Sequence, residues 1–182
     1  MAFSWKSLLT DVASALLKEG ARSLQSSGKQ QRRGPSQPRR EQPAAAGGYP
    51  GDFTGIPQIS YSPQAGDTPD PGEVVWAWVP YEEDHSQGKD RPVLLVGRDG
   101  DWLLALPLTS KDHDRDAAQE ARAGRHWIDV GTGAWDRQGR PSEARVDRII
   151  RVAPDGVRRT GAALNREVFD RVADAVVARA TR

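Results

Sequence analysis

Apolar and polar positions divide the chain into three parts with different patterns. In residues 1–27 the apolar side chains recur at helical spacing, which predicts an amphipathic helix. Residues 28–71 are rich in Gly, Pro, Ser and Gln, are basic in their first part, and are predicted to form a disordered linker. In residues 72–182 short apolar runs alternate with turn residues, which predicts a compact, mainly β domain.

The strongest local pattern in the third part is a β-hairpin. Two short apolar runs, Val93–Val96 and Trp102–Leu106, flank the pair Asp99-Gly100. An Asp-Gly pair between two such runs is typical of a tight primed turn, which needs positive φ. Because both runs are continuously apolar, we expect the two strands to be covered on both faces, as in a small barrel.

Polar side chains close both outer ends of this hairpin. Arg91 begins the first strand, and Thr109 and Ser110 end the second. The start of one antiparallel strand lies beside the end of the next, so we expect these groups at one end of the sheet. Guanidinium and hydroxyl groups together can bind the oxygens of a phosphate. The alternative is a structural salt bridge from Arg91 to Asp90 or Glu73.

Further elements are expected around the hairpin. The predicted strands are Val74–Val79, His126–Val130 and Glu143–Val152. Residues 111–125 are predicted as a loop with a helical turn. Asn165 is a plausible N-cap for a closing helix in which Val168, Val172 and Val176 repeat at helical spacing. Five or so strands and this helix predict a small, partly open barrel. Apolar residues are also scattered between positions 49 and 61, and the sequence does not decide whether they pack on this barrel.

Composition narrows the classes of function. Residues 1–71 carry a net charge of +2 and residues 72–182 carry −1, so an RNA substrate would need a local positive groove. Cysteine is absent, which excludes a disulfide framework and a thiolate nucleophile. No apolar run approaches the ~20 residues that span a bilayer. We expect a cytoplasmic protein. Its first helix is expected to pack on its own chain, to be partly disordered or to dock on a partner; contact with a membrane surface is disfavoured because its polar face is not strongly basic.

Four motifs follow one another in the third part: GEVVWAWVP, RPVLLV, ALPLTS and SEARVDRIIRV. In this order they resemble the MazF/PemK family of toxin endoribonucleases, over about residues 72–179. The resemblance implies an SH3-like barrel of the MazF/PemK/CcdB type, a homodimer and a cognate antitoxin that inhibits the toxin. It also implies metal-independent cleavage of single-stranded RNA by 2′-hydroxyl attack, leaving 2′,3′-cyclic phosphate and 5′-hydroxyl ends, with no cofactor.

By the same resemblance, catalysis is assigned to the arginine of the Arg-Pro motif and the threonine of the Thr-Ser pair. These are Arg91 and Thr109, with Ser110 as a second hydrogen-bond donor. Arginine is a poor general base because its pKa lies above ~12. We therefore expect Arg91 to act chiefly by electrostatic stabilisation, and a role in proton transfer stays open.

Four further residues are predicted to contact RNA: Lys89, Lys111, His113 and Trp135. The histidine is expected in a loop near the mouth of the site. The tryptophan lies in a turn-rich stretch, where its ring could stack on a base, whereas strand tryptophans are expected in the core. No metal site is predicted, because the acids around His113 lack the glycine and the terminal glutamate of a calcium loop.

Two other functions stay open at this point. The domain could be a non-catalytic SH3-like binding module tethered by its N-terminal helix, or a gyrase-directed toxin of the CcdB type. Two departures from the family also matter. Residues 131–142 lack an apolar, lysine-containing stretch common in the family, and residues 1–71 have no counterpart in the compact toxins. The sequence that is cleaved is therefore not predicted.

Overall fold

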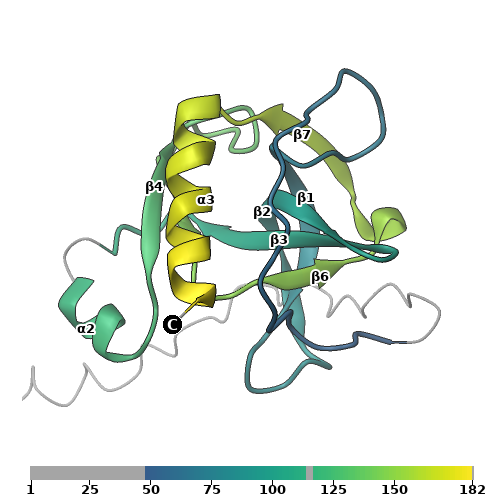
Figure 1. The fold of residues 1–182 in the computed structure, drawn as a ribbon. Helices are drawn as coiled ribbons and strands as arrows, with labels where there is room; N and C mark the ends of the chain where they lie inside the picture. Colours follow the sequence, from purple (N-terminus) through teal and green to yellow (C-terminus); the bar gives the residue numbers. More distant parts are fainter. Residues whose placement is uncertain (1–47, 114–116, 182) are drawn as a thin grey trace, which may run out of the picture. The chain divides into compact units, whose positions relative to one another are not determined.

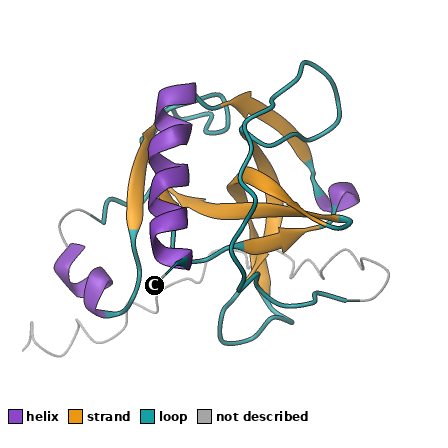
Figure 2. Ribbon diagram, in the orientation of Figure 1, coloured by secondary structure: helices purple, strands orange, loops and turns teal. Residues whose placement is uncertain are grey.

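The computed structural model describes residues 48–113 and 117–181. The predicted N-terminal helix, residues 1–27, and the first part of the predicted linker lie outside these residues. Within them the fold is mainly β: antiparallel strands curl into a half-open barrel, and a long helix lies across it (Figures 1 and 2). The predicted fold class is confirmed for this part of the chain.

The described strands are β1 (Glu73–Pro80), β2 (Gly88–Asp99), β3 (Trp102–Thr109), β4 (Trp127–Gly131), β5 (Ser142–Arg145), β6 (Ile150–Val152) and β7 (Arg159–Ala163). The helical elements are α2 (Ala117–Arg122), the 3₁₀ turn η2 (Pro154–Gly156) and α3 (Arg166–Ala180). The strand order is β4-β5-β3-β2-β1-β7, and β6 also pairs with β3. Because β3 pairs with β6 along its first half and with β5 at its end, the sheet divides and curls there.

The central strands β2 and β3 are covered on both faces, which confirms the expectation from their apolar runs. Alternate residues enter two separate core clusters: Leu94 and Leu106 belong to one, Val93 and Leu95 to the other. Phe169 of α3 belongs to the first cluster, so the helix covers that face of the sheet. Burial of each such side chain contributes about 1.5–3 kcal/mol to folding.

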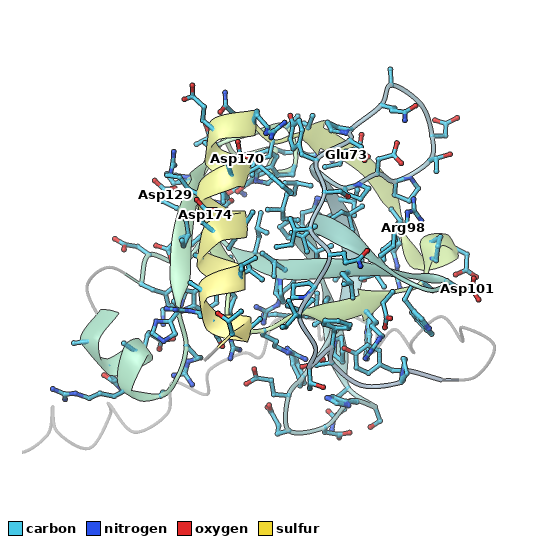
Figure 3. All side chains as sticks on the ribbon, viewed as in Figure 1. Glu73, Arg98, Asp101, Asp129, Asp170 and Asp174 are labelled. Atoms are coloured by element: carbon cyan, nitrogen blue, oxygen red, sulfur yellow. The ribbon has the colours of Figure 1, made fainter. Side chains whose placement is uncertain are left out.

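Helix α3 begins at the predicted N-cap. The side chain of Asn165 accepts hydrogen bonds from the backbone N–H groups of Glu167 (2.9 Å) and Val168 (3.3 Å). The buried residues of the helix are Phe169, Val172 and Val176. Asp170 and Asp174 are exposed and extend outward from it (Figure 3). No described helix is long and apolar enough to cross a membrane.

The turn between β2 and β3 is displaced by one residue from the prediction. Asp99 pairs with Trp102, so the two-residue loop is Gly100-Asp101 and not Asp99-Gly100. Gly100 has a φ of +60°, and Asp101 has no positive φ. This pattern is that of a type II′ turn, which needs glycine only at its first central position. The predicted hairpin is confirmed, but the predicted central pair is wrong.

Two other predictions about strands need correction. The segment Glu143–Val152, predicted as one strand, forms β5 and β6, with residues 146–149 between them. This break lets β3 pair with both. Strand β7 was not predicted at all, because RTGAA shows no alternation of apolar and polar residues. It pairs with β1 at the edge of the sheet.

Residues 48–71, called the arm below, pack on the barrel, so the prediction of a disordered linker is wrong for this part. Phe53 and Ile59 each form a backbone bridge to the barrel. The hydroxyl of Tyr61 donates to the carbonyl oxygen of Leu164 at 2.8 Å. All three side chains are partly buried against the core under α3. The arm is therefore part of the folded domain.

The arm crosses the barrel at Gly97. A Cβ atom at this position would lie 2.3 Å from the carbonyl oxygen of Gln58, well inside contact distance. Strand β2 also has a bulge here, since Leu95 pairs with Ala105 and Gly97 with Leu104. Glycine is needed at this point because two backbones approach each other so closely.

Candidate active site

Arg91 and Thr109 lie at the same end of the sheet. Val93 of β2 pairs with Pro107 of β3, and the same register continued outward places Arg91 opposite Thr109. Both residues line one pocket of about 280 Å³, together with Ser110. We call it the hydroxyl pocket. Other residues on its wall are Trp76, Lys89, Asp90, Asp136, Arg140 and Ser142.

The side chain of Arg91 is a half-buried cation that no described carboxylate neutralises. Its Nε is buried and has no hydrogen-bond partner among the described residues. The two partners considered from the sequence are engaged elsewhere. Asp90 Oδ2 accepts from Arg158 Nη1 at 2.8 Å, and Glu73 Oε2 accepts from the backbone N–H of Asp70 at 3.1 Å. The alternative of a structural salt bridge for Arg91 is therefore contradicted.

Neighbouring cations surround this guanidinium. Burial lowers the pKa of Arg91; the phenol of Tyr81 raises it, and the charges of Arg148 and Arg145 lower it further. The charge of Arg91, followed by burial, lowers the pKa of Lys89. These shifts record repulsion between like charges in a partly dry site. The result is a local positive field in a domain whose net charge is not positive, and a bound anion would relieve it.

The hydroxyl of Thr109 is fixed by a turn at the end of β3. The backbone N–H of Lys111 donates to Thr109 Oγ1 at 3.1 Å. A hydroxyl that accepts one hydrogen bond still has its own proton to donate. Ser110 is exposed and lines the same pocket, whereas Lys111 is exposed outside the pocket wall. The site thus combines an unneutralised guanidinium with one oriented hydroxyl and a second one beside it.

Trp135 has a different place from the one predicted. It is only 4% exposed and belongs to the core, so neither ring face is open to a base. Its indole N–H donates to Ser142 Oγ at 3.2 Å, and its carbonyl accepts from Trp76 Nε1 at 2.9 Å. A Cβ atom on Gly133 would lie 2.0 Å from the ring, so this glycine makes room for it. Trp135 holds the loop that brings Arg140 to the pocket, which corrects the stacking prediction.

His113 is also buried, at 8% exposure. Its Nδ1 lies 2.8 Å from Glu143 Oε2, and its backbone N–H donates to Glu143 Oε1 at 3.3 Å. Its ring stacks on Trp127 with 4.1 Å between the ring centroids. The residue anchors the segment that follows Ser110, so the prediction of an RNA contact from an open loop is corrected.

Three arginines that sequence reasoning did not select lie around Arg91. Arg140 lines the hydroxyl pocket. Arg145 and Arg148 line a second pocket of about 310 Å³, which also includes Tyr81 and Arg91. We call it the arginine pocket. Residues three apart in one continuous strand would point to opposite faces. Because β5 ends at Arg145, both arginines reach one pocket, and the sequence pattern alone does not indicate this.

Comparison with known proteins identifies the region that holds these pockets. The model of the family described as "PemK-like, MazF-like toxin of type II toxin-antitoxin system" matches residues 70–178, more than half of the chain. Among solved structures, a crystal structure of MazE-MazF from Deinococcus radiodurans is similar, with 19% identity and a TM-score of 0.43, over 62% of this chain and 96% of that chain. No curated protein sequence matches. On the family match, this chain belongs to the PemK-like, MazF-like toxins of type II toxin–antitoxin systems.

Proposed function

We propose that this protein is a metal-independent endoribonuclease that cleaves single-stranded RNA in the hydroxyl pocket. One observation carries the proposal: Arg91, without a described carboxylate partner, shares a pocket with the Thr109 hydroxyl. A guanidinium binds two phosphate oxygens at once through its planar donors. Membership of a toxin family supports the same function.

The reaction we propose is attack by the RNA's own 2′-hydroxyl. The 2′-oxygen bonds to phosphorus, the bond from phosphorus to the 5′-oxygen breaks, and the products are a 2′,3′-cyclic phosphate and a 5′-hydroxyl. Negative charge grows on the non-bridging oxygens in the transition state, where Arg91 and Thr109 donate hydrogen bonds to it. Ser110 supplies a second hydroxyl donor. Since DNA has no 2′-hydroxyl, it is not a substrate.

The main contribution of the pocket is electrostatic. A proton must leave the 2′-hydroxyl and another must reach the 5′-oxygen. Arg91 remains a poor base, even with a lowered pKa. Asp136 also lines the pocket, but the hydrogen bond from Arg140 lowers the pKa of this carboxyl and makes it a weak base. Stabilisation of the phosphorane charge is therefore the role assigned to Arg91 and Thr109.

As partners we propose a cognate antitoxin protein and a second copy of the chain. The family is that of type II toxins, which are paired with an antitoxin. An unneutralised arginine at the site is a suitable target for a carboxylate of such an inhibitor. Co-expression with its cognate antitoxin should abolish cleavage, and light scattering on the purified protein should give twice the mass of the chain.

The first test is cleavage of a mixed-sequence single-stranded RNA in EDTA. The wild type should cut and leave cyclic phosphate ends. Arg91→Ala and Thr109→Val should each lose about 10²-fold or more in rate, as expected when a preorganised donor is removed. Thr109→Ser is the matched control, because it keeps the hydroxyl that valine lacks, and should retain activity within about tenfold.

One result would contradict the proposal directly. If folded, antitoxin-free wild type leaves the RNA intact, or if Thr109→Val cuts as fast as Thr109→Ser, the assigned chemistry is absent. The non-catalytic binding module would then be the better description of the domain.

A further inference from the structure

Arg91 forms part of the wall of two pockets, the hydroxyl pocket and the arginine pocket. An RNA strand with its cleaved phosphate on Arg91 therefore has a second pocket directly beside that phosphate. The arginine pocket also has Tyr81 and Trp127 on its wall. Its volume of about 310 Å³ is within the range of small-ligand sites.

The two arginines that give this pocket its name are each oriented by a carboxylate partner. Asp147 Oδ2 accepts from Nη2 of Arg145 at 2.8 Å, and Asp52 Oδ2 accepts from Nε of Arg148 at 2.7 Å. The side chains of Arg145 and Arg148 are 14% and 8% exposed. Both guanidinium groups are thus held in place before any ligand arrives.

Glu82 is a third carboxylate that pairs with these two arginines and, unlike Asp147 and Asp52, it lines the pocket itself. It lies in the loop between β1 and β2, and its side chain is 45% exposed. Its Oε1 lies 2.6 Å from Arg145 Nη1 and 3.6 Å from Arg148 Nε. One anionic oxygen shared by two guanidinium groups is the contact that a phosphate oxygen would make. An exposed carboxylate is also the easiest of the three to displace.

We propose that Arg145 and Arg148 form a second phosphate-binding site for the RNA strand, next to the cleaved phosphate, and that Glu82 occupies this site in the free protein. The inference rests on the proposed nuclease function and adds a binding site to it. When a phosphate displaces Glu82, Arg145 keeps its bond to Asp147 and its Nη1 becomes available. The aromatic side chains on the pocket wall then lie beside the nucleotide that carries this phosphate, where a ring can contact its base.

The test compares Glu82→Gln with Glu83→Gln in the full chain. Glu83 is the next residue in the chain and lines the same pocket, and its replacement by glutamine removes the same charge. Unlike Glu82, it forms no ion pair with a described residue. The probe is a mixed-sequence single-stranded RNA with 2′-O-methyl groups, which attack by the 2′-hydroxyl cannot cleave. Fluorescence anisotropy over a range of salt concentrations gives its affinity.

Glu82→Gln should bind the probe about threefold or more tightly than wild type, because one competing carboxylate is gone. The slope of log affinity against log salt should stay close to that of wild type, because the bound strand makes the same phosphate contacts in both proteins. Glu83→Gln should bind nearly as wild type. In the double variant Glu82→Gln/Arg145→Gln, the gain should disappear, with thermal melting to confirm that the protein is folded.

Equal gains from Glu82→Gln and Glu83→Gln would overturn the proposal, because the effect would then be one of overall charge. A gain that persists without Arg145 would overturn it too. Cleavage of unmodified RNA by wild type, measured in parallel, separates this inference from the proposed function. A wild type that cleaves while Glu82→Gln binds as wild type refutes the second site alone. A wild type that does not cleave refutes the nuclease, and the binding data still decide the second site.

Discussion

Arg91, which lines both pockets, differs from Arg145 and Arg148 in its pairing with carboxylates. In the hydroxyl pocket, Arg91 has no ion pair within the described residues and a buried Nε without a hydrogen bond. In the arginine pocket, Arg145 and Arg148 each contact two carboxylates. Removing one partner of a buried ion pair lowers stability because the other charge is left uncompensated, whereas Arg91 has no such partner to lose among the described residues. We therefore expect the first pocket to determine rate and the second to contribute to stability.

The largest expected effect is a fall in cleavage rate without a fall in stability when Arg91 is replaced. Arg91→Gln should lower the cleavage rate by about 10²-fold or more, because a charge-stabilising donor is lost. Its free energy of unfolding should stay within about 0.5 kcal/mol of wild type or rise, since no described ion pair is broken. Cleavage kinetics and urea unfolding of the same preparation test this. A large fall in stability would mean that Arg91 is a structural residue, and the contrast between the pockets would fail.

The next largest effect is a loss of stability in the arginine pocket. Asp52→Asn removes the hydrogen-bonded carboxylate partner of Arg148, whose side chain is 8% exposed, and should lower the free energy of unfolding by about 2 kcal/mol. The cleavage rate should fall less than tenfold. Asp170→Asn is a matched control, because Asp170 pairs with Arg166 on the exposed face of α3. That surface pair should be worth less than about 0.5 kcal/mol.

Acid should weaken the same pair. Burial raises the pKa of Asp52, but hydrogen bonds from Arg148 and Tyr49 outweigh it, so the pKa lies below its ordinary value of 3.8. A carboxyl with a lowered pKa stabilises the fold above its unfolded pKa, and this is lost as pH falls through the folded pKa. The stability difference between wild type and Asp52→Asn should be constant from neutral pH to about pH 5 and shrink below about pH 4. Urea unfolding at each pH measures it; a difference that grows in acid would contradict the assignment.

The smallest effect concerns two lysines near the hydroxyl pocket. Lys89 lines the pocket and Lys111 does not. Lys89→Gln should weaken RNA binding a few-fold and flatten the salt dependence by about 0.7, while Lys111→Gln should change both less. Neither should alter thermal stability. If the two variants behave alike, the charge acts through the general field of the surface and not through the pocket.

The parts of the fold that the sequence predicts correctly have local causes. The apolar runs on both sides of Gly100 specify two strands covered on both faces, and Asn165 specifies the start of α3. The meeting of Arg91 and Thr109 follows from the pairing of two strands joined by a short turn. Each of these inferences depends only on residues that are close to one another in the sequence.

The errors concern residues whose environment is made by distant segments. The arm packs because Gly97, far along the chain, leaves space for its backbone. Trp135 is buried because it packs in the cluster that contains Leu106 and Phe169, and Trp76 donates to its carbonyl. The joint placement of Arg145 and Arg148 depends on where a strand ends. None of these conditions appears as a periodic pattern of apolar residues.

The contact between Asp52 and Arg148 has a consequence for the arm as a whole. The arm begins outside the region matched by the family, which starts at residue 70, yet its carboxylate holds an arginine of the proposed RNA site. Free-energy coupling of this kind is reciprocal. A partner that draws the arm away from Gly97 also withdraws Asp52 and changes the affinity for RNA. RNA bound at this proposed site would then change the equilibrium for release of the arm by the same factor.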